Sequence, residues 1–220
     1  MPWKPSVPGE IPTLGYEVLD WITSALAAPD RAEYEPFVPY LEQEDFILRW
    51  YALDPVTGRR KYNRGVLGRP RGWGKSPLLA ALACVEALGP VVPDGWNADG
   101  QPVGRPWADL RTPLVQIAAV SEDQTRNTWS PVLEMLCEDA PVHDLVRGLE
   151  PMETFVALPN RGRMEQVTSS ARTIKGARAV FAVLDQSEEW VASNGGLKLA
   201  TTMRANAAKV GGTTIESPNA

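Results

Sequence analysis

The sequence has few of the residues that hold metals and disulfides: its 220 residues include two cysteines and one histidine. Cys84 and Cys137 each stand in an apolar stretch typical of a helix, so we expect buried thiols, which suit a reducing cytoplasm. His143 has no cysteine or histidine nearby in the sequence, which argues against a zinc site. Apolar runs of about 18 residues are also missing, so we expect no membrane-spanning helix, and the first residues do not resemble a secretory signal.

An excess of positive charge is missing too, because 22 basic and 27 acidic side chains leave a net charge of −5. This balance gives no support for a strongly basic DNA-binding domain. The basic residues are nevertheless concentrated over 59–75, a stretch without any acid that contains Arg59, Arg60, Lys61, Arg64, Arg69, Arg71 and Lys75. Such a cluster suits contact with a polyanion. For the part from Arg59 to Arg64, a solvated loop face is an equally good interpretation.

Apolar residues, in contrast, make up 44% of the chain, and 220 residues are enough for one domain with a full core. We expect a Pro-rich extension and a helix within 1–39, followed by the main domain over 40–220. Hydrophobic periodicity predicts a helix over 13–28 with Tyr16, Leu19, Ile22 and Leu26 toward the core. It predicts a second helix over 40–53 with apolar surface from Leu41, Phe46, Leu48 and Trp50.

The rest of the chain alternates between predicted strands and helices, which favours an α/β fold. The predicted elements are a strand over 60–67, a helix over 77–88, a hairpin turning at Asp99–Gly100, a strand over 113–120, a helix from the N-cap Ser121 through Cys137, paired strands over 154–158 and 164–168, and a buried strand over 179–184.

The most informative stretch follows the strand that ends near Leu67. It comprises Arg69, Pro70, Arg71, Gly72, Trp73, Gly74, Lys75 and Ser76 and leads into a run of strong helix formers. Glycines allow close approach and unusual φ, and the N–H groups of such a turn point at phosphates. Lys75 would reach the β- and γ-phosphates of a nucleotide, and the Ser76 hydroxyl would ligate Mg²⁺. Arg69 stands where the usual pattern has a glycine, so a second motif is needed to exclude an ordinary strand–turn–helix corner.

That second motif is the buried strand over 179–184, which ends in Asp185. A strand that delivers an aspartate at its carboxyl end is typical of the Mg²⁺ carboxylate in phosphate-loop enzymes. We therefore predict that the loop and Asp185 lie at the carboxyl ends of adjacent parallel strands. Hydrolysis also requires a residue that orients or deprotonates water. Gln186, which follows Asp185, is an amide and cannot act as a base, so we favour Glu188, with Glu189 as the second choice.

These motifs resemble those of the large terminase subunits of tailed bacteriophages, the ATP-driven motors that package DNA. The family's phosphate loop has an arginine in the position of Arg71, for which the resemblance implies a phosphate-sensing role. The stretch ending at Gln124, the acidic motif displaced by Gln186, and the coupling motif over 212–220 complete the likeness. The resemblance also implies an adenine contact, for which Gln43 is our candidate.

The resemblance implies an α/β, RecA-like P-loop NTPase with a mainly parallel central sheet flanked by helices. It implies ATP and Mg²⁺ as ligands and double-stranded DNA, a portal protein and a small terminase subunit as partners, in the host cytoplasm without a membrane. Family members act as rings in which a basic residue completes the neighbouring site, and the candidates here are Arg172, Lys175 and Arg178. They also carry a nuclease domain, which we expect to be absent from this chain, as in a fragment that holds only the ATPase domain.

Two other functions remain open on the sequence alone. The same fold also serves helicase-like nucleic-acid translocases. Gln186 leaves room for an ATP-binding assembly module with little catalysis. A small-molecule kinase is the least favoured, because the sequence shows no sign of a lid or a second substrate pocket.

Overall fold

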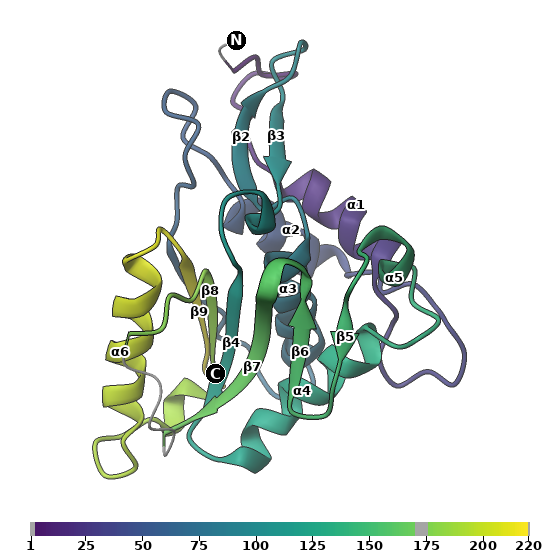
Figure 1. The fold of residues 1–220 in the computed structure, drawn as a ribbon. Helices are drawn as coiled ribbons and strands as arrows, with labels where there is room; N and C mark the ends of the chain where they lie inside the picture. Colours follow the sequence, from purple (N-terminus) through teal and green to yellow (C-terminus); the bar gives the residue numbers. More distant parts are fainter. Residues whose placement is uncertain (1–2, 170–175, 220) are drawn as a thin grey trace.

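A computed structural model describes residues 3–169 and 176–219 and shows a central sheet with helices on both faces (Figure 1). The seven strands follow the order β1 (Arg64–Val66), β9 (Thr213–Ser217), β8 (Phe181–Asp185), β4 (Leu114–Ala119), β7 (Gly162–Thr168), β6 (Phe155–Leu158) and β5 (Glu150–Pro151). The first five run parallel, and β6 and β5 are antiparallel additions at one edge. The predicted mainly parallel α/β sheet is thus confirmed.

Strand β8 is buried on both faces, because its successive side chains point to opposite sides of the sheet and helices cover each side there. In β8, Phe181 and Val183 join the larger core beneath α3 (Lys75–Leu88) and α4 (Glu122–Met135). Ala182 and Leu184 face the other way, into a smaller core beneath α6 (Gly196–Ala208). This explains why the β8 sequence reads as a continuous apolar run rather than an alternating one.

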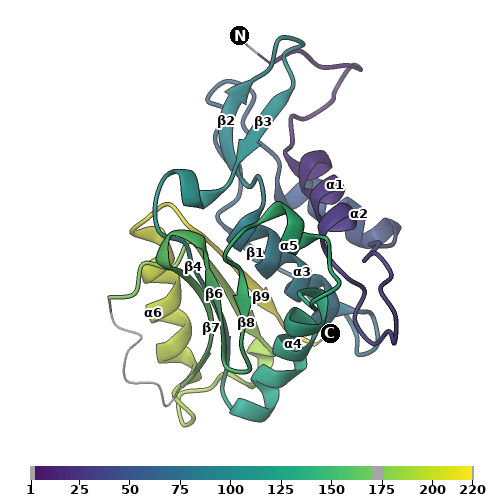
Figure 2. The same ribbon diagram turned by 45° about the vertical axis from the view of Figure 1, so that its right-hand side comes forward.

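Helix α3 is the centre of the larger core, since every residue from Leu78 to Ala87 is buried. Its many alanines let neighbouring elements approach closely. The layer is extended by α1 (Gly15–Ala25), α2 (Leu41–Trp50) and the short α5 (Val142–Leu145) (Figure 2). Three single 3₁₀ turns, at Trp107–Asp109, Pro159–Arg161 and Ser187–Glu189, complete the helical elements described.

The first two helices form where predicted, but the prediction that Tyr16 and Leu41 lie on their apolar faces is wrong. Tyr16 is 60% exposed and Leu41 is 81% exposed. Helix α1 instead packs through Gly15, where an added Cβ would lie 2.7 Å from Leu48 Cα. The contact of α1 with α2 is therefore made at Gly15, and the next residue, Tyr16, lies outside it.

The predicted hairpin is confirmed as β2 (Val92–Trp96) and β3 (Pro102–Arg105), which project from one end of the molecule (Figure 1). The turn residue Gly100 has φ +79°, a conformation that glycine adopts without strain. The antiparallel pairing of β6 with β7 also matches the prediction. The strand predicted over 60–67 is shorter, because only Arg64–Val66 pairs with a neighbour in the sheet.

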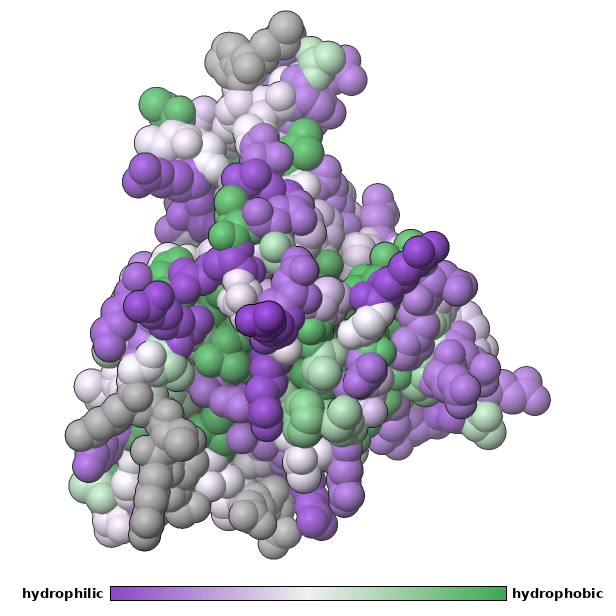
Figure 3. Space-filling model, in the orientation of Figure 1, coloured by the Kyte–Doolittle hydropathy of each residue, from purple (hydrophilic) through white to green (hydrophobic). Residues whose placement is uncertain are grey.

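Helix α6 covers only part of its face of the sheet. Beyond it, polar side chains lie across β4 and β7: Gln116 Nε2 donates to Glu165 Oε1 at 2.9 Å, and Glu165 pairs with Arg163 at 3.0 Å. Hydrophilic residues accordingly run through the middle of this face, with apolar ones in separate patches (Figure 3). Across the described ranges, 3–169 and 176–219, no helix has the length and apolar character needed to cross a membrane.

Candidate nucleotide-binding site

The carboxyl ends of β1, β9 and β8 lead three segments to one cavity of about 630 Å³. Its lining comprises Pro70, Arg71, Gly72, Gly74, Lys75, Ser76, Pro77, Asn127, Asp185, Gln186 and Asn219. The predicted loop and the predicted acidic strand therefore meet. One detail of the prediction is wrong: β1 and β8 are not adjacent, because β9 lies between them. Insertion of β9 brings Asn219 into the lining, two residues beyond the end of that strand.

The loop conformation depends on glycine at two positions. Gly72 has φ +80° and Gly74, the residue before α3, has φ +83°. Gly74 is also closely approached, since an added Cβ would lie 3.1 Å from Gln43 Nε2. A side chain there would be both strained and crowded. Lys75 and Ser76, the first residues of α3, line the cavity, so the helix N-terminus with its free N–H groups opens onto it.

The Lys75 ammonium lies within the cavity lining and donates to three oxygens of the protein. Its Nζ bonds Asn219 Oδ1 at 2.6 Å, the backbone oxygen of Pro70 at 3.4 Å and that of Arg69. Two of these acceptors belong to the phosphate loop itself, and the third follows β9. Lys75 thereby connects the loop to the end of β9.

Asp185 is the acidic group of the site and is only 3% exposed. Thr128 Oγ1 donates to its Oδ2 at 2.7 Å, and the Gln186 N–H donates to its Oδ1 at 2.9 Å. Burial raises the pKa of the Asp185 carboxyl; these two hydrogen bonds and the Lys75 charge oppose that effect, whereas the Glu188 charge adds to it. Asp185 and Ser76 together offer the oxygen ligands that Mg²⁺ prefers.

Gln186 turns the chain sharply after Asp185, with φ +49° in the left-handed region. The 3₁₀ turn Ser187–Glu189 follows, and it sends the two glutamates to different partners. Glu188 Oε1 accepts from Asn219 Nδ2, while Glu189 Oε2 accepts from Gln124 Nε2 on α4. Glu188 is thus joined through Asn219 to Lys75, and Glu189 is held against α4.

Three other predicted residues are not in the cavity lining: Arg69 and Trp73 belong to the phosphate loop, and Gln43 lies beside that loop on α2. The Gln43 amide is buried: its Nε2 donates to Gly74 O at 3.2 Å, and its Oε1 accepts from the Tyr40 N–H at 3.4 Å. The Arg69 guanidinium lies 5.3 Å from the Trp73 ring centroid, and the Trp73 indole donates to Glu42 at 2.8 Å. These contacts hold the loop from behind, and the adenine contact of Gln43 stays a prediction.

The basic cluster at 59–75 is divided among several elements rather than forming one surface. Arg60 pairs with the buried Glu86 at 3.1 Å, and Arg64 pairs with Glu216 at 2.7 Å. Arg71, by contrast, lines the cavity. Of the candidates for a basic residue acting on a neighbouring subunit, Arg178 is exposed, while Arg172 and Lys175 lie outside the described residues.

Sequence reasoning missed Asn127 and Thr128, which reach the site from α4. Their spacing from Gln124, at i, i+3 and i+4, places all three on one helix face. This polar triplet, directly after the capped start of a helix that follows a buried strand, is the signal that would have found them.

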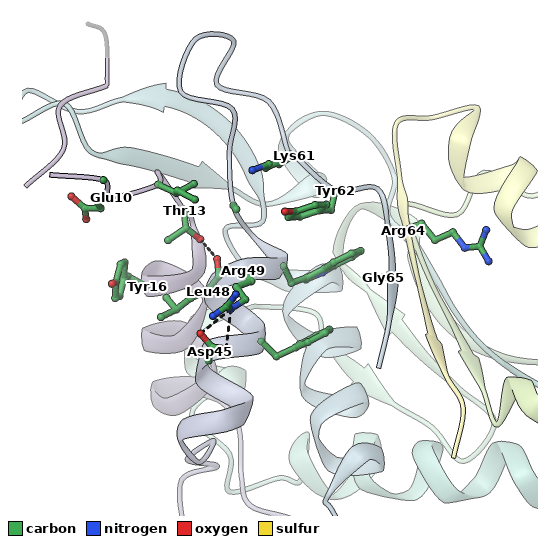
Figure 4. A pocket seen from close by; sticks show the side chains of 15 residues that line it. Glu10, Thr13, Tyr16, Asp45, Leu48, Arg49, Lys61, Tyr62, Arg64 and Gly65 are labelled. Carbon is green, nitrogen blue, oxygen red and sulfur yellow. Dashed lines mark hydrogen bonds and ion pairs between the residues drawn. The ribbon is translucent and has the colours of Figure 1, made fainter. Parts of the chain in front are cut away.

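A second cavity of about 660 Å³ lies between the segment 9–16, α2 and the start of β1 (Figure 4). Much of its lining is apolar or aromatic, and its Arg49 is paired with Asp45 at 2.9 Å. None of the residues recorded in its lining belongs to the phosphate loop or to β8. It is therefore separate from the candidate site.

Among curated proteins, the chain is similar to the Gene 13 protein of Mycobacterium phage L5, with 32% identity over 239 residues, and to that of Mycobacterium phage D29, with 30% identity over 241 residues. Each match covers 96% of this chain but 39% of the relative, so the chain spans about two fifths of their length. No family model matches the sequence.

Among solved structures, the HK97 bacteriophage large terminase aligns with a TM-score of 0.67 at 17% identity, over 94% of this chain and 38% of that one. The ATPase domain of the Thermus phage P74-26 large terminase aligns with a TM-score of 0.53 at 14% identity, over 83% of this chain and 65% of that one. The chain is thus related in sequence to phage Gene 13 proteins, and its fold is the RecA-like P-loop fold of large terminase ATPase domains.

Proposed function

We propose that this chain is the ATPase motor domain of a phage large terminase, which hydrolyses ATP to drive double-stranded DNA into a prohead. The observation that carries the proposal is the convergence of Lys75, Ser76 and Asp185 on one cavity at the carboxyl ends of the sheet. The likeness of the fold to large terminases, and of the sequence to phage proteins, supports it.

The residues present fit a magnesium nucleotide. The loop offers glycine-supported N–H groups and a lysine, and Ser76 and Asp185 are oxygen ligands facing the same cavity. Among residues 3–169 and 176–219, no cluster of three or more acidic, histidine or cysteine side chains forms a metal site by itself. That suits Mg²⁺, which enzymes commonly hold through one or two protein ligands together with phosphates. When bound, the ion neutralises charge on the phosphates.

The proposal assigns a role in hydrolysis to three residues of the site. Lys75 and Arg71 stabilise the charge that develops on the γ-phosphate. Glu188 orients and deprotonates the attacking water, because its contact with Asn219 turns it toward the loop, whereas Glu189 is held by Gln124. Double-stranded DNA, a portal protein, a small terminase subunit and further copies of the chain in a ring would be its partners in the host cytoplasm.

The direct test is Lys75→Ala, compared with Lys61→Ala, which removes an exposed lysine outside the loop. We expect the first substitution to abolish ATP hydrolysis and the second to leave it unchanged, with both proteins retaining the parent melting temperature. Full ATPase activity in a folded Lys75→Ala protein would refute the proposal. With an active parent, stimulation by duplex DNA without strand separation supports packaging, and unwinding supports a helicase-like translocase instead.

A further inference from the structure

Helix α4 places two threonines in matched settings near the candidate site. Thr125 and Thr128 are both completely buried and lie one turn apart. The Thr125 hydroxyl donates to the carbonyl oxygen of Ser121 within its own helix, at 2.9 Å. The Thr128 hydroxyl instead leaves its helix and donates to Asp185 Oδ2 at 2.7 Å. Only the second contact reaches the acidic group of the cavity.

The contacts of Asp185 fix the direction of its carboxylate. The Gln186 N–H holds one oxygen, the Thr128 hydroxyl holds the other, and the Trp190 indole donates to the Asp185 backbone oxygen at 2.9 Å. Each carboxylate oxygen has about two lone-pair sites. One hydrogen bond to each oxygen therefore leaves acceptor capacity for a cation in the cavity that Asp185 lines.

We infer that Thr128 is a positioning residue for the metal carboxylate: its hydroxyl orients Asp185 and so sets the affinity of the site for Mg²⁺. The inference rests on the proposed function, since it assigns Asp185 to the metal of the nucleotide complex. Groups that hydrogen-bond a metal ligand from behind restrict its orientation, and their loss commonly costs about 10–100-fold in metal affinity or activity. A threonine that served packing alone would not affect Mg²⁺ selectively.

The experiment measures binding of a fluorescent, non-hydrolysable ATP analogue as Mg²⁺ is titrated. Thr128→Val removes the hydroxyl and keeps the shape, Thr128→Ser keeps the hydroxyl, and Thr125→Val is the matched control. We expect Thr128→Val to raise the Mg²⁺ concentration for half-maximal binding at least tenfold, while affinity in EDTA is unchanged. Thr128→Ser and Thr125→Val should stay close to the parent.

Melting temperatures show which variants fold, and Thr128→Ala provides the same test should the valine variant not fold. An unchanged Mg²⁺ midpoint in a folded Thr128→Val or Thr128→Ala protein overturns the inference. So does an equal shift in Thr125→Val, or a tenfold shift in Thr128→Ser. A parent that shows no Mg²⁺-dependent nucleotide binding refutes the proposed function together with the inference, whereas a normal parent with unaffected variants refutes the inference alone.

Discussion

At the scale of single residues, Asp185 is a carboxylate held in a buried position. Because burial raises its pKa, the folded protein binds its proton more tightly than the unfolded chain does. The free energy of unfolding therefore decreases as pH rises from the ordinary carboxyl pKa, about 4, through the higher pKa of the folded state. The ionised site residue thus lowers stability at neutral pH, a common feature of functional groups.

This predicts that Asp185→Asn melts at a higher temperature than the parent at neutral pH, in buffer without metal or nucleotide. The difference should shrink as the pH is lowered toward 4, because the parent then gains its proton. Thermal melts across this pH range check the prediction, with Asp139→Asn, at an exposed position, as the control. An Asp185→Asn protein less stable than the parent at pH 7 would contradict it.

The two glutamates after Gln186 give a second prediction at this scale. Glu188→Gln should lower ATP turnover by about 10²–10⁴-fold, the usual contribution of a general base, because it keeps the hydrogen bonding but cannot take a proton. Glu189→Gln should change turnover by less than about threefold, since its carboxylate is held by Gln124. Steady-state ATPase assays of the two variants show which glutamate acts as the general base. Near-zero rates in both the parent and Glu188→Gln would favour an assembly module.

Single residues also show which parts of the candidate site and the core could be predicted from the sequence alone. The convergence of the loop and Asp185 on one cavity was predictable, because glycines, a lysine and a strand-terminal aspartate in that order are typical of phosphate-binding sites. The hydrogen bond from Thr128 to Asp185 was not, since a polar triplet on one helix face gives no sign of the partner that the fold brings to it. Tyr16 and Leu41 were misassigned because periodicity marks an apolar face but not whether a neighbouring element covers it.

At the scale of elements, α3 connects the phosphate loop to the core through a buried ion pair. Glu86 accepts from Arg60 at 3.1 Å and from the Tyr51 hydroxyl at 3.0 Å, and the Arg60 guanidinium lies 4.3 Å from the Tyr51 ring centroid. Burial raises the pKa of Glu86, and the Arg60 charge opposes that effect. The cluster fastens α3 to the segment between α2 and β1.

We predict that Glu86→Ala lowers the free energy of unfolding by about 3–5 kcal/mol, because it leaves the Arg60 charge buried without its partner. Tyr51→Phe removes one hydrogen bond and should cost about 1–3 kcal/mol. Urea denaturation measures both, with the exposed Glu138→Ala as the control. A loss below about 1 kcal/mol for Glu86→Ala would contradict the prediction and show that water solvates the Arg60 guanidinium once Glu86 is removed.

Among elements, the sequence predicted most strands and helices but not their order in the sheet. Local periodicity specified β4, β6, β7 and β8, and the Asp99–Gly100 turn specified the hairpin. Placement of β9 between β1 and β8 depends on contacts between residues far apart in the chain, such as the pairing of Arg64 with Glu216. No local pattern encodes such a pairing.

At the scale of the whole molecule, Arg178 lies three residues before the start of β8, whereas Asp185 is the last residue of that strand. The five residues of that strand span roughly 16 Å. The exposed Arg178 is thus distant from the site of its own chain, and a catalytic role would require the site of another copy.

This predicts complementation between two impaired proteins. Lys75→Ala should be inactive and Arg178→Ala should hydrolyse ATP weakly, whereas their mixture should exceed the sum of the two, because a Lys75→Ala copy still supplies Arg178 to its neighbour. ATPase assays of mixtures at increasing total concentration provide the measurement. Strictly additive rates at every ratio would assign Arg178 to a structural role.

The three oxygens around the Lys75 ammonium affect which anions the loop accepts. To bind Lys75, a phosphate must replace Asn219 and two carbonyl groups as its hydrogen-bond partners. A small monovalent anion would gain little binding free energy from that replacement. In the proposed function, the triphosphate would supply the negative charge for that exchange. The Asn219 amide would then lose its contact with Lys75 and keep the one with Glu188, so nucleotide binding would change the contacts at the end of β9.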